Sequence, residues 1–432
     1  MQLNSKRMVQ VLAGSGVSAL ATMLLAVAIL LERPLAEYGF YAFLQVLLGL
    51  AMATSSALFV APLLSRLNPA PAQASAPVGA FFLLQTVLIL VLGLVVYGLS
   101  LVYQHPPSTA LGLALAMVLQ LWRWFARSIL QTRADCQSLI SSDAIFSGIT
   151  LLGLALLWWQ QQIDLASIAI LTIVAAIGSM LSAGRFFWQL HTQIWQQCCW
   201  AEWRQGYQAQ GKPAFIGVLS SESAANAHSY LVTLIAGPAA FAPIAAAAMV
   251  FRPCALLLTN FSQLSRSQLL QLKHQDQALL PLVARFRQHA ALLWLLNVLL
   301  LLIVVSIAWE PIRVFLIEKQ LDEQTIVWAI LGWGVLTLLR CWRSGATIYL
   351  QVQDQFAVLA RTAVMPALLS VGLVIVSLQW WPAVWTLAAI IVSELWMAWL
   401  LRRAVLRTDA NNAHATATSR HGNETSTNKT SI

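Results

Sequence analysis

The sequence predicts an all-α integral membrane protein with about twelve transmembrane helices in two six-helix lobes. Composition is the first reason: the chain has 432 residues, 59% hydrophobic and 9% charged, with a mean hydropathy of +0.73. A soluble domain has about 25% charged residues. The second reason is the series of apolar runs that reach about 20 residues, the length that crosses a bilayer. The third is a weak repeat between the two halves.

Apolar runs bounded by Pro, Gly and charged residues predict the spans in order. They are expected at 9–31, 39–64, 79–103, 109–130, 142–160, 165–190, 213–236, 239–264, 289–309, 324–350, 357–378 and 383–404. Lys6 and Arg7 precede the first run as in a signal peptide, but that run is too long for a signal core. We therefore expect an uncleaved first helix.

The distribution of positive charge predicts the orientation. With the N-terminus inside, the expected external loops hold Arg33, Arg313 and Lys319 from the 25 Lys and Arg of the chain. Cytoplasmic loops carry the excess of Lys and Arg in membrane proteins. Both termini are therefore predicted on the cytoplasmic side. The net charge of +9 then reflects topology rather than nucleic-acid binding.

Four segments are expected along the chain. Residues 1–190 would form the N-terminal lobe and residues 213–404 the C-terminal lobe. The Trp-rich stretch 191–212 suits a cytoplasmic linker helix lying in the membrane interface. Residues 405–432 are rich in Asn, Thr, Ser and Ala, and a disordered cytoplasmic tail is predicted there.

Short matches recur in the same order in both halves. Leu64-Ser65-Arg66 corresponds to Leu264-Ser265-Arg266, and Trp122-Arg123 corresponds to Trp342-Arg343. Because six is even, corresponding spans run in the same direction, which predicts parallel repeats about an axis along the membrane normal. Such an arrangement often has a binding site between lobes near mid-bilayer.

The seventh expected span is unusually polar. Within Pro213 to Gly237, the residues Glu222, Asn226, Ser229 and Thr233 are spaced to share one helical face. A carboxyl group inside a membrane usually faces a water-filled cavity or a partner. The span therefore lines a polar path, or else it is a buried helix whose Ser and Thr are satisfied internally.

Several of these stretches resemble a known family. Gly211-Lys212-Pro213, Gly237-Pro238-Ala239-Ala240, Ala245-Ala246-Ala247 and Arg252-Pro253 look like the start of the second lobe of polysaccharide-type flippases. Leu35 to Ala42 (LAEYGFYA) is similar to that family's turn into span two. These flippases belong to the multidrug/oligosaccharidyl-lipid/polysaccharide (MOP) exporter superfamily. The resemblance implies a MATE-like fold of two six-helix lobes that moves lipid-linked sugars across the bacterial inner membrane.

Four arginines inside the spans are candidates for binding a pyrophosphate, because a guanidinium donates several hydrogen bonds and stays charged. They are Arg123, Arg252, Arg340 and Arg343. Arg252 is similar in position to a cavity arginine of the related lipid II flippases, whereas Arg123 and Arg343 could instead extend to the interface. Asn226 and Ser229 are further substrate-binding candidates.

Glu222 and Glu394 are the two carboxyl groups expected near mid-span, and each could pair with arginine, take up a proton or bind a cation. They are the candidate ion-coupling residues. Neither a metal site nor a cofactor is expected.

The leading hypothesis is an alternating-access flippase for an undecaprenyl-pyrophosphate-linked oligosaccharide, the repeat unit of a surface polysaccharide such as O-antigen or exopolysaccharide. Expected partners are that lipid-linked substrate, membrane lipids and the polysaccharide polymerase and chain-length machinery. The first alternative is an ion-coupled exporter of drugs or small cations from the same superfamily. The second is a membrane glycan polymerase or ligase, but the longest expected external loop, 310–323, lacks His. We therefore do not expect an enzyme.

Overall fold

The computed structural model describes residues 5–60, 62–63, 79–132, 136–183, 187–188, 199–273, 279–353 and 355–427. The described residues contain helices and no strand. In the first half the helices are α1 (Ser5–Glu32), α2 (Leu35–Ser55) with the π-helical turn η1 (Ser56–Val60), α4 (Gly79–Val102), α5 (Pro107–Thr132), α6 (Cys136–Trp159) and α7 (Leu165–Leu181).

The second half begins with α9 (Trp200–Gly206), which runs through the π-helical turn η2 (Tyr207–Gly211) into the next helix. The helices that follow are α10 (Lys212–Leu231) with η3 (Val232–Ala236), α11 (Pro238–Lys273), α12 (Leu280–Ile307), the short α13 (Trp309–Glu318), α14 (Glu323–Val352), α15 (Phe356–Trp380), and α16 (Thr386–Thr427) after the turn η4 (Ala383–Trp385).

Among the described residues, nine helices are long and apolar enough to cross a membrane, and residues 16–32 and 165–181 form two shorter apolar helices. The polar helix α10 coincides with the remaining predicted span. This confirms the predicted fold class, an all-helical membrane protein with about twelve spans.

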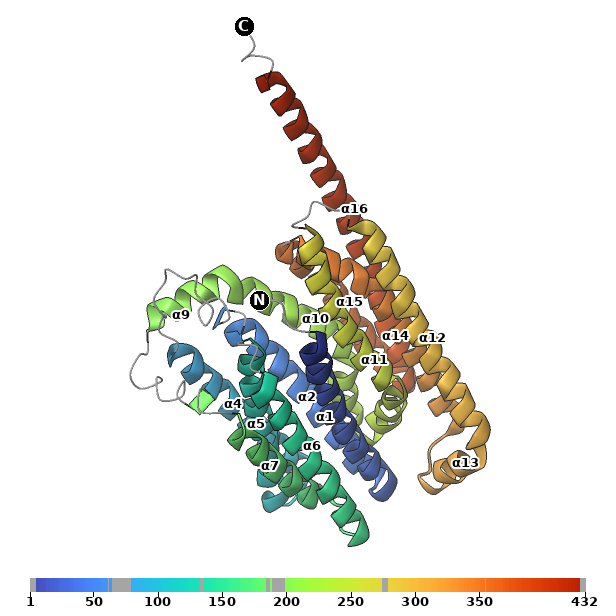
Figure 1. Cartoon of the computed structure of the whole chain (residues 1–432). Helices are drawn as coiled ribbons and strands as arrows, with labels where there is room; N and C mark the ends of the chain where they lie inside the picture. Colours follow the sequence, from blue (N-terminus) through green and yellow to red (C-terminus); the bar gives the residue numbers. More distant parts are fainter. Residues whose placement is uncertain are drawn as a thin grey trace.

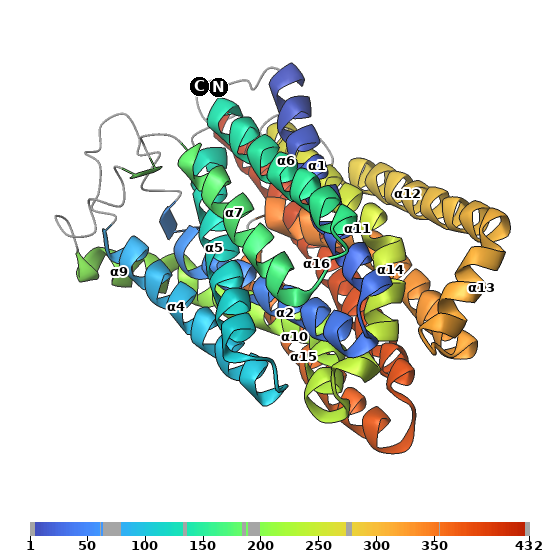
Figure 2. The same cartoon turned by 90° about the horizontal axis from the view of Figure 1, so that it is seen from below.

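The two halves of the chain lie side by side in the structure (Figure 1). Helices α4, α5, α6 and α7 pack together with α1 in one half, and α10, α14, α15 and α16 pack in the other (Figure 2). Helix α2 packs against α10 and α11 and joins the halves. Helix α13 lies at one end of the bundle, and both chain termini lie at the other (Figure 1). We refer to these as the α13 end and the α16 end.

The seam between the halves is tight at the α13 end. A Cβ atom on Gly39 would lie 1.9 Å from the backbone carbonyl oxygen of Pro238, so a larger residue does not fit there. Gly237 has φ of +87°, a backbone conformation that glycine adopts without strain, and it turns the chain from η3 into α11. The stretches 35–42 and 237–240 therefore contact each other.

Hydrogen bonds reinforce the same end of the seam. Lys319 Nζ donates to the Arg33 carbonyl oxygen at 3.0 Å, and Tyr103 Oη donates to the Thr233 carbonyl oxygen at 2.8 Å. Each bond joins a residue of the first half to a residue of the second.

Several predicted bounds were wrong because hydropathy marks the apolar part of a helix and not its ends. The predicted loop 265–288 is largely helical, since α11 continues to Lys273 and α12 starts at Leu280. Conversely, α7 ends at Leu181 rather than at residue 190. The predicted external loop 310–323 contains α13.

The structure has helices in the described part of the linker and in the tail. Residues 200–211 form α9 and η2 in continuity with α10, and residues 191–198 lie outside the described residues. The tail from residue 405, predicted to be disordered, continues α16 as a helix to Thr427 and projects beyond the bundle (Figure 1). Alanine recurs along this stretch and has the highest helix propensity, a local preference that the disorder prediction ignored.

Candidate functional site

A cavity of about 490 Å³ lies where the two halves meet. One wall comes from α2, and the others come from α10, α11 and α14. We call it the central cavity. The residues that line it include Tyr38, Tyr41, Gln45, Gly49, Glu222, Asn226, Ser229, Ala255, Arg252, Thr259, Trp333 and Arg340. Its position between the halves is the one that the parallel repeat predicts.

The central cavity is closed at the α13 end. Tyr38 and Tyr41, near the start of α2, are 0% and 4% exposed. Further along α11, the lining residues Ala255 and Thr259 are exposed. The tight seam at Gly39 lies beside the buried end. The cavity therefore opens toward the α16 end.

Arg252 lines the cavity from α11 and is the free cation among its described lining residues. Its guanidinium makes neither a hydrogen bond nor an ion pair with the part of the chain that the structure describes. A guanidinium in this setting has unused donors for a carboxylate or phosphate oxygen.

Two further donors in the cavity lack protein partners. The hydroxyl of Tyr38 and the side-chain amide nitrogen of Gln45 are buried and make no hydrogen bond within the described residues. A buried polar group without a partner is costly, and a bound molecule that accepts hydrogen bonds would relieve that cost. The cavity thus combines an uncompensated positive charge with neutral donors.

Helix α10 presents its predicted polar face to the cavity. Glu222, Asn226 and Ser229 all line it, and Asn226 Nδ2 donates to Glu222 Oε2 at 2.8 Å. Ser229 is within hydrogen-bonding distance of the adjacent His228 ring, 3.2 Å away. Thr233, the fourth residue of the predicted face, lies in η3 and is buried. Glu222, Asn226 and Ser229 thus lie where they would if this helix lines a polar path.

Arg340 and Arg343, one turn apart on α14, share the buried carboxylate of Glu394 on α16. Arg340 Nε donates to Glu394 Oε1 at 3.3 Å, and its terminal nitrogen donates to the Ala225 carbonyl oxygen. Arg343 Nε lies 2.8 Å from Glu394 Oε2, although the orientation does not make a hydrogen bond. Glu394 is 0% exposed. We call these three residues the Arg–Glu–Arg cluster.

The two arginines of this cluster face different spaces. Arg340 lines the central cavity, whereas Arg343 lines a second cavity of about 350 Å³ between α10, α14, α15 and α16. We call the second one the side pocket. The arginine candidates of the sequence therefore do not all gather in one site.

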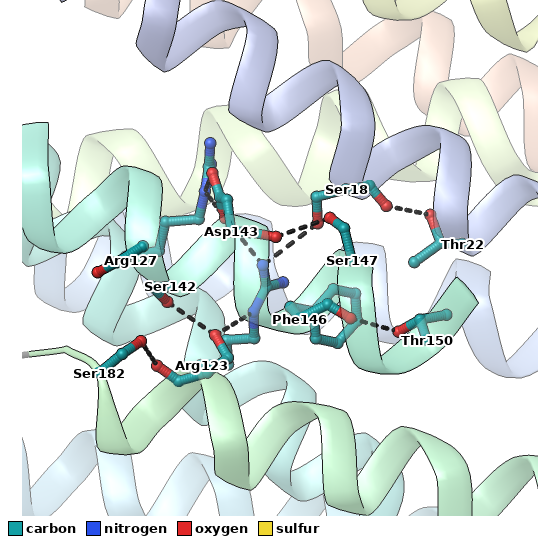
Figure 3. Close-up of polar contacts among 12 residues, drawn as sticks. Ser18, Thr22, Arg123, Arg127, Ser142, Asp143, Phe146, Ser147, Thr150 and Ser182 are labelled. Carbon is teal, nitrogen blue, oxygen red and sulfur yellow. Dashed lines mark hydrogen bonds and ion pairs between the residues drawn. The ribbon is translucent and has the colours of Figure 1, made fainter. Parts of the chain in front are cut away.

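Arg123 lies in a separate cluster in the first half (Figure 3). Its terminal nitrogen donates to Asp143 Oδ1 at 2.8 Å, its Nε donates to Ser179, and Arg127 Nε lies 3.1 Å from the same carboxylate. The Arg123 guanidinium also stacks 3.7 Å from the centre of the Phe146 ring. We call Arg123, Asp143 and Arg127 the Arg–Asp–Arg cluster. It lines neither of the two cavities.

Sequence reasoning did not single out Asp143, Tyr38 or the side-chain amide of Gln45 as candidate site residues. Asp143 was placed at the very start of the fifth span, but α6 begins at Cys136, so Asp143 lies two turns inside the helix. Arg123 and Arg127 are four residues apart on one face of α5, and that pairing could have indicated a buried counterion.

Comparisons with known proteins support the fold. No family model and no curated protein sequence matches the chain. Its fold is similar to the crystal structure of a MATE P26A mutant, with a TM-score of 0.59, 12% identity, and coverage of 94% of this chain and 97% of that one. A MOP superfamily transporter from Pyrococcus furiosus, described as having a binding pocket of reverse polarity that suggests a different function, matches with a TM-score of 0.60, 13% identity, and 92% and 94% coverage.

An inward-facing multidrug resistance MATE family transporter of the MOP superfamily also matches, with a TM-score of 0.55, 13% identity, and 94% and 97% coverage. Together with the helices described above, these similarities define a multi-pass membrane protein with the MATE/MOP superfamily transporter fold. Identities of this size establish the fold alone.

Proposed function

We propose that this protein is a flippase that moves a lipid-linked oligosaccharide, carried on undecaprenyl pyrophosphate, from the cytoplasmic to the periplasmic leaflet of the bacterial inner membrane. It works by alternating access, with the site alternately open to each side. Both termini are cytoplasmic, so the α16 end faces the cytoplasm. The flipped unit is then consumed by a reaction that polymerises glycans and sets their chain length.

The observation that carries the proposal is the guanidinium of Arg252 in the central cavity, which has no partner in the described part of the chain. A pyrophosphate brings negative charge into a space largely out of water, and a charged hydrogen bond there is stronger than a neutral one. The partnerless donors of Tyr38 and Gln45 suit the oxygen-rich remainder of such a headgroup.

The shape of the cavity supports loading from one side. The α13 end is held shut by Gly39 against Pro238 and by the bond from Lys319 to Arg33. Delivery to the other leaflet requires these contacts to break while the α16 end closes. Rocking of one lobe against the other is the motion that this fold permits.

The proposal is tested by measuring the lipid-linked glycan intermediates of cells with and without the gene. Loss of the gene should leave a complete lipid-linked repeat unit on the cytoplasmic leaflet and remove the surface glycan. An unchanged pool of lipid intermediates would contradict the flippase.

The second candidate is an ion-coupled exporter of drugs or small cations, and Glu222 favours it. This carboxyl group lines the central cavity, where a cationic substrate would pair with it. Loss of an exporter should make cells sensitive to cationic dyes while leaving glycan lipids unchanged. The same pair of strains therefore separates the two candidates.

A further inference from the structure

The side pocket is a second polar space that the proposed transport cycle does not use. Its polar lining residues come from η1, α10, α14 and α15, and they are Ser56, Ser221, Thr347, Gln351, Arg343 and Thr362. Two consecutive residues of α10 line different spaces, since Ser221 lines the side pocket and Glu222 the central cavity. Helix α10 therefore forms part of the wall between the two spaces.

Arg343 has donors to spare in this pocket. It is 20% exposed, its buried Nε lies 2.8 Å from Glu394 Oε2, and its two terminal nitrogens make no hydrogen bond among the described residues. The second arginine of the cluster, Arg340, already donates to the same carboxylate. A single carboxylate carries one negative charge against two guanidinium groups, so an anion beside Arg343 would meet uncompensated positive charge.

Much of the α15 and α16 lining of the side pocket is apolar. Phe356 and Leu359 of α15 line it together with Met397 and Leu401 of α16. Phe356 is 45% exposed, and it lies at the first residue of α15, at the α16 end of the bundle. One cationic and hydroxyl-lined wall and one apolar wall together fit a molecule with an anionic head and a hydrocarbon chain.

We propose that the side pocket binds the phosphate group of an amphiphile, with Arg343 pairing the phosphate and the Phe356, Leu359 and Leu401 wall holding the first part of the chain. This site is separate from the central cavity, and the proposal does not depend on what the protein transports. Two sources share this chemistry: an anionic phospholipid of the cytoplasmic leaflet, and an isoprenoid phosphate.

Glu394 connects this site to the central cavity. A phosphate that draws Arg343 away from Glu394 leaves the carboxylate to Arg340, which lines the central cavity. Occupancy of the side pocket would then hold Arg340 more firmly on Glu394 and lower the positive charge available in the central cavity.

Binding of two probes to the purified full-length protein tests the proposal. The probes are dioleoyl phosphatidylglycerol and undecaprenyl phosphate, and bound molecules are counted by native mass spectrometry. The test variant is Arg343→Gln. The matched control is Arg361→Gln, which removes an exposed arginine of α15 next to the pocket residue Ala360 but outside the pocket.

We expect Arg343→Gln to weaken binding of at least one probe by roughly 10- to 100-fold, the range for losing a charged hydrogen bond, with no change in Arg361→Gln. Loss of phosphatidylglycerol alone identifies the source as a membrane phospholipid, and loss of undecaprenyl phosphate alone identifies an isoprenoid phosphate. Equal binding of both probes by the wild type and Arg343→Gln would overturn the proposal.

A second variant covers the case in which Arg343→Gln does not fold. Ala214→Trp fills the side pocket from α10 and leaves the Arg–Glu–Arg cluster intact. It should weaken the same probe, whereas unchanged binding of both probes in this variant would also overturn the proposal.

Discussion

The two halves of the molecule each hold a pair of arginines around one buried carboxylate, yet the surroundings of the two clusters differ. In the Arg–Asp–Arg cluster, Arg123 is 12% exposed and is further held by Ser179 and the Phe146 ring. In the Arg–Glu–Arg cluster, Arg340 is 27% exposed and borders the central cavity, and Arg343 borders the side pocket. The first cluster borders neither cavity, and the second lies between the two.

An arginine inside a membrane span is therefore not by itself a binding residue. The repeat pairs Trp122-Arg123 with Trp342-Arg343, and the sequence alone treats both as equal candidates. Arg123 and Arg343 differ in whether a cavity lies beside the guanidinium and in how many of its N–H donors lack a hydrogen bond. Both properties depend on packing between helices. We infer that the Arg–Asp–Arg cluster stabilises the first half of the molecule. The Arg–Glu–Arg cluster, together with Arg252, would bind anionic groups.

The largest effect should come from Asp143→Ala. This change leaves Arg123 and Arg127 without their shared carboxylate in a buried setting, where breaking an ion pair costs about 3–5 kcal/mol. The free energy of unfolding should fall by about that amount, visible as a large drop in Tm of the purified protein.

Glu394→Ala is the matched comparison, because Arg340 and Arg343 border cavities that admit water. The free energy of unfolding should fall clearly less in Glu394→Ala than in Asp143→Ala. Equal losses in the two variants would remove the distinction between the clusters.

The next effect concerns Arg252→Ala. Loss of its charged hydrogen bonds should weaken binding of an isoprenoid pyrophosphate by about 1.5–3 kcal/mol, with the fold and Tm retained because Arg252 has no partner among the residues that the structure describes. Titration of the probe into purified protein measures this change. Arg361→Gln serves as the control for general loss of charge. Wild-type affinity in Arg252→Ala would exclude Arg252 from the site.

Gly39→Ala should shift the balance between conformations. The added methyl group would lie 1.9 Å from the Pro238 carbonyl oxygen, and overpacking of this kind costs about 1–3 kcal/mol. The state closed at the α13 end loses that stability, so a cysteine at Ala42 in the central cavity should become more reactive toward an impermeant reagent from that side.

Gly49→Ala provides the control on the same helix, since no described atom lies within 4 Å of the position that its methyl group would take. Reactivity that rises equally in both glycine variants would mean that the seam at Gly39 does not gate the cavity.

The smallest effect on substrate binding is expected from Glu222→Gln, which keeps a hydrogen-bonding group beside Asn226. Transport should continue but with an altered dependence on pH or on the coupling cation, because the titrating group is gone. Transport measured across a pH series, with Glu323→Gln as a control outside the cavity, checks this. An unaltered profile would make Glu222 structural.

The sequence predicted the fold class and the polar face of α10, because both follow from local patterns. Apolar runs of sufficient length mark spans, and the spacing of Glu222, Asn226 and Ser229 places them on one side of a helix. The position of Arg252 in the cavity was likewise expected from the resemblance. Its role in transport stays a prediction.

Other features could not be predicted because they depend on how distant helices pack. Asp143 and Arg123 are on different helices, and their contact follows from the packing within the first half. The division of Arg340 and Arg343 between two cavities depends on where α10 and α16 lie. Helix ends such as Lys273 extend past the apolar run, so hydropathy does not reveal them.

The most direct test of the flippase is the leaflet distribution of the lipid-linked repeat unit in cells that lack the gene and express either the wild type or Arg252→Ala. The account predicts that the wild type restores delivery to the periplasmic leaflet and the surface glycan. Cells with Arg252→Ala, at equal protein level in the membrane, should keep the repeat unit on the cytoplasmic leaflet. Full restoration by Arg252→Ala would contradict the account.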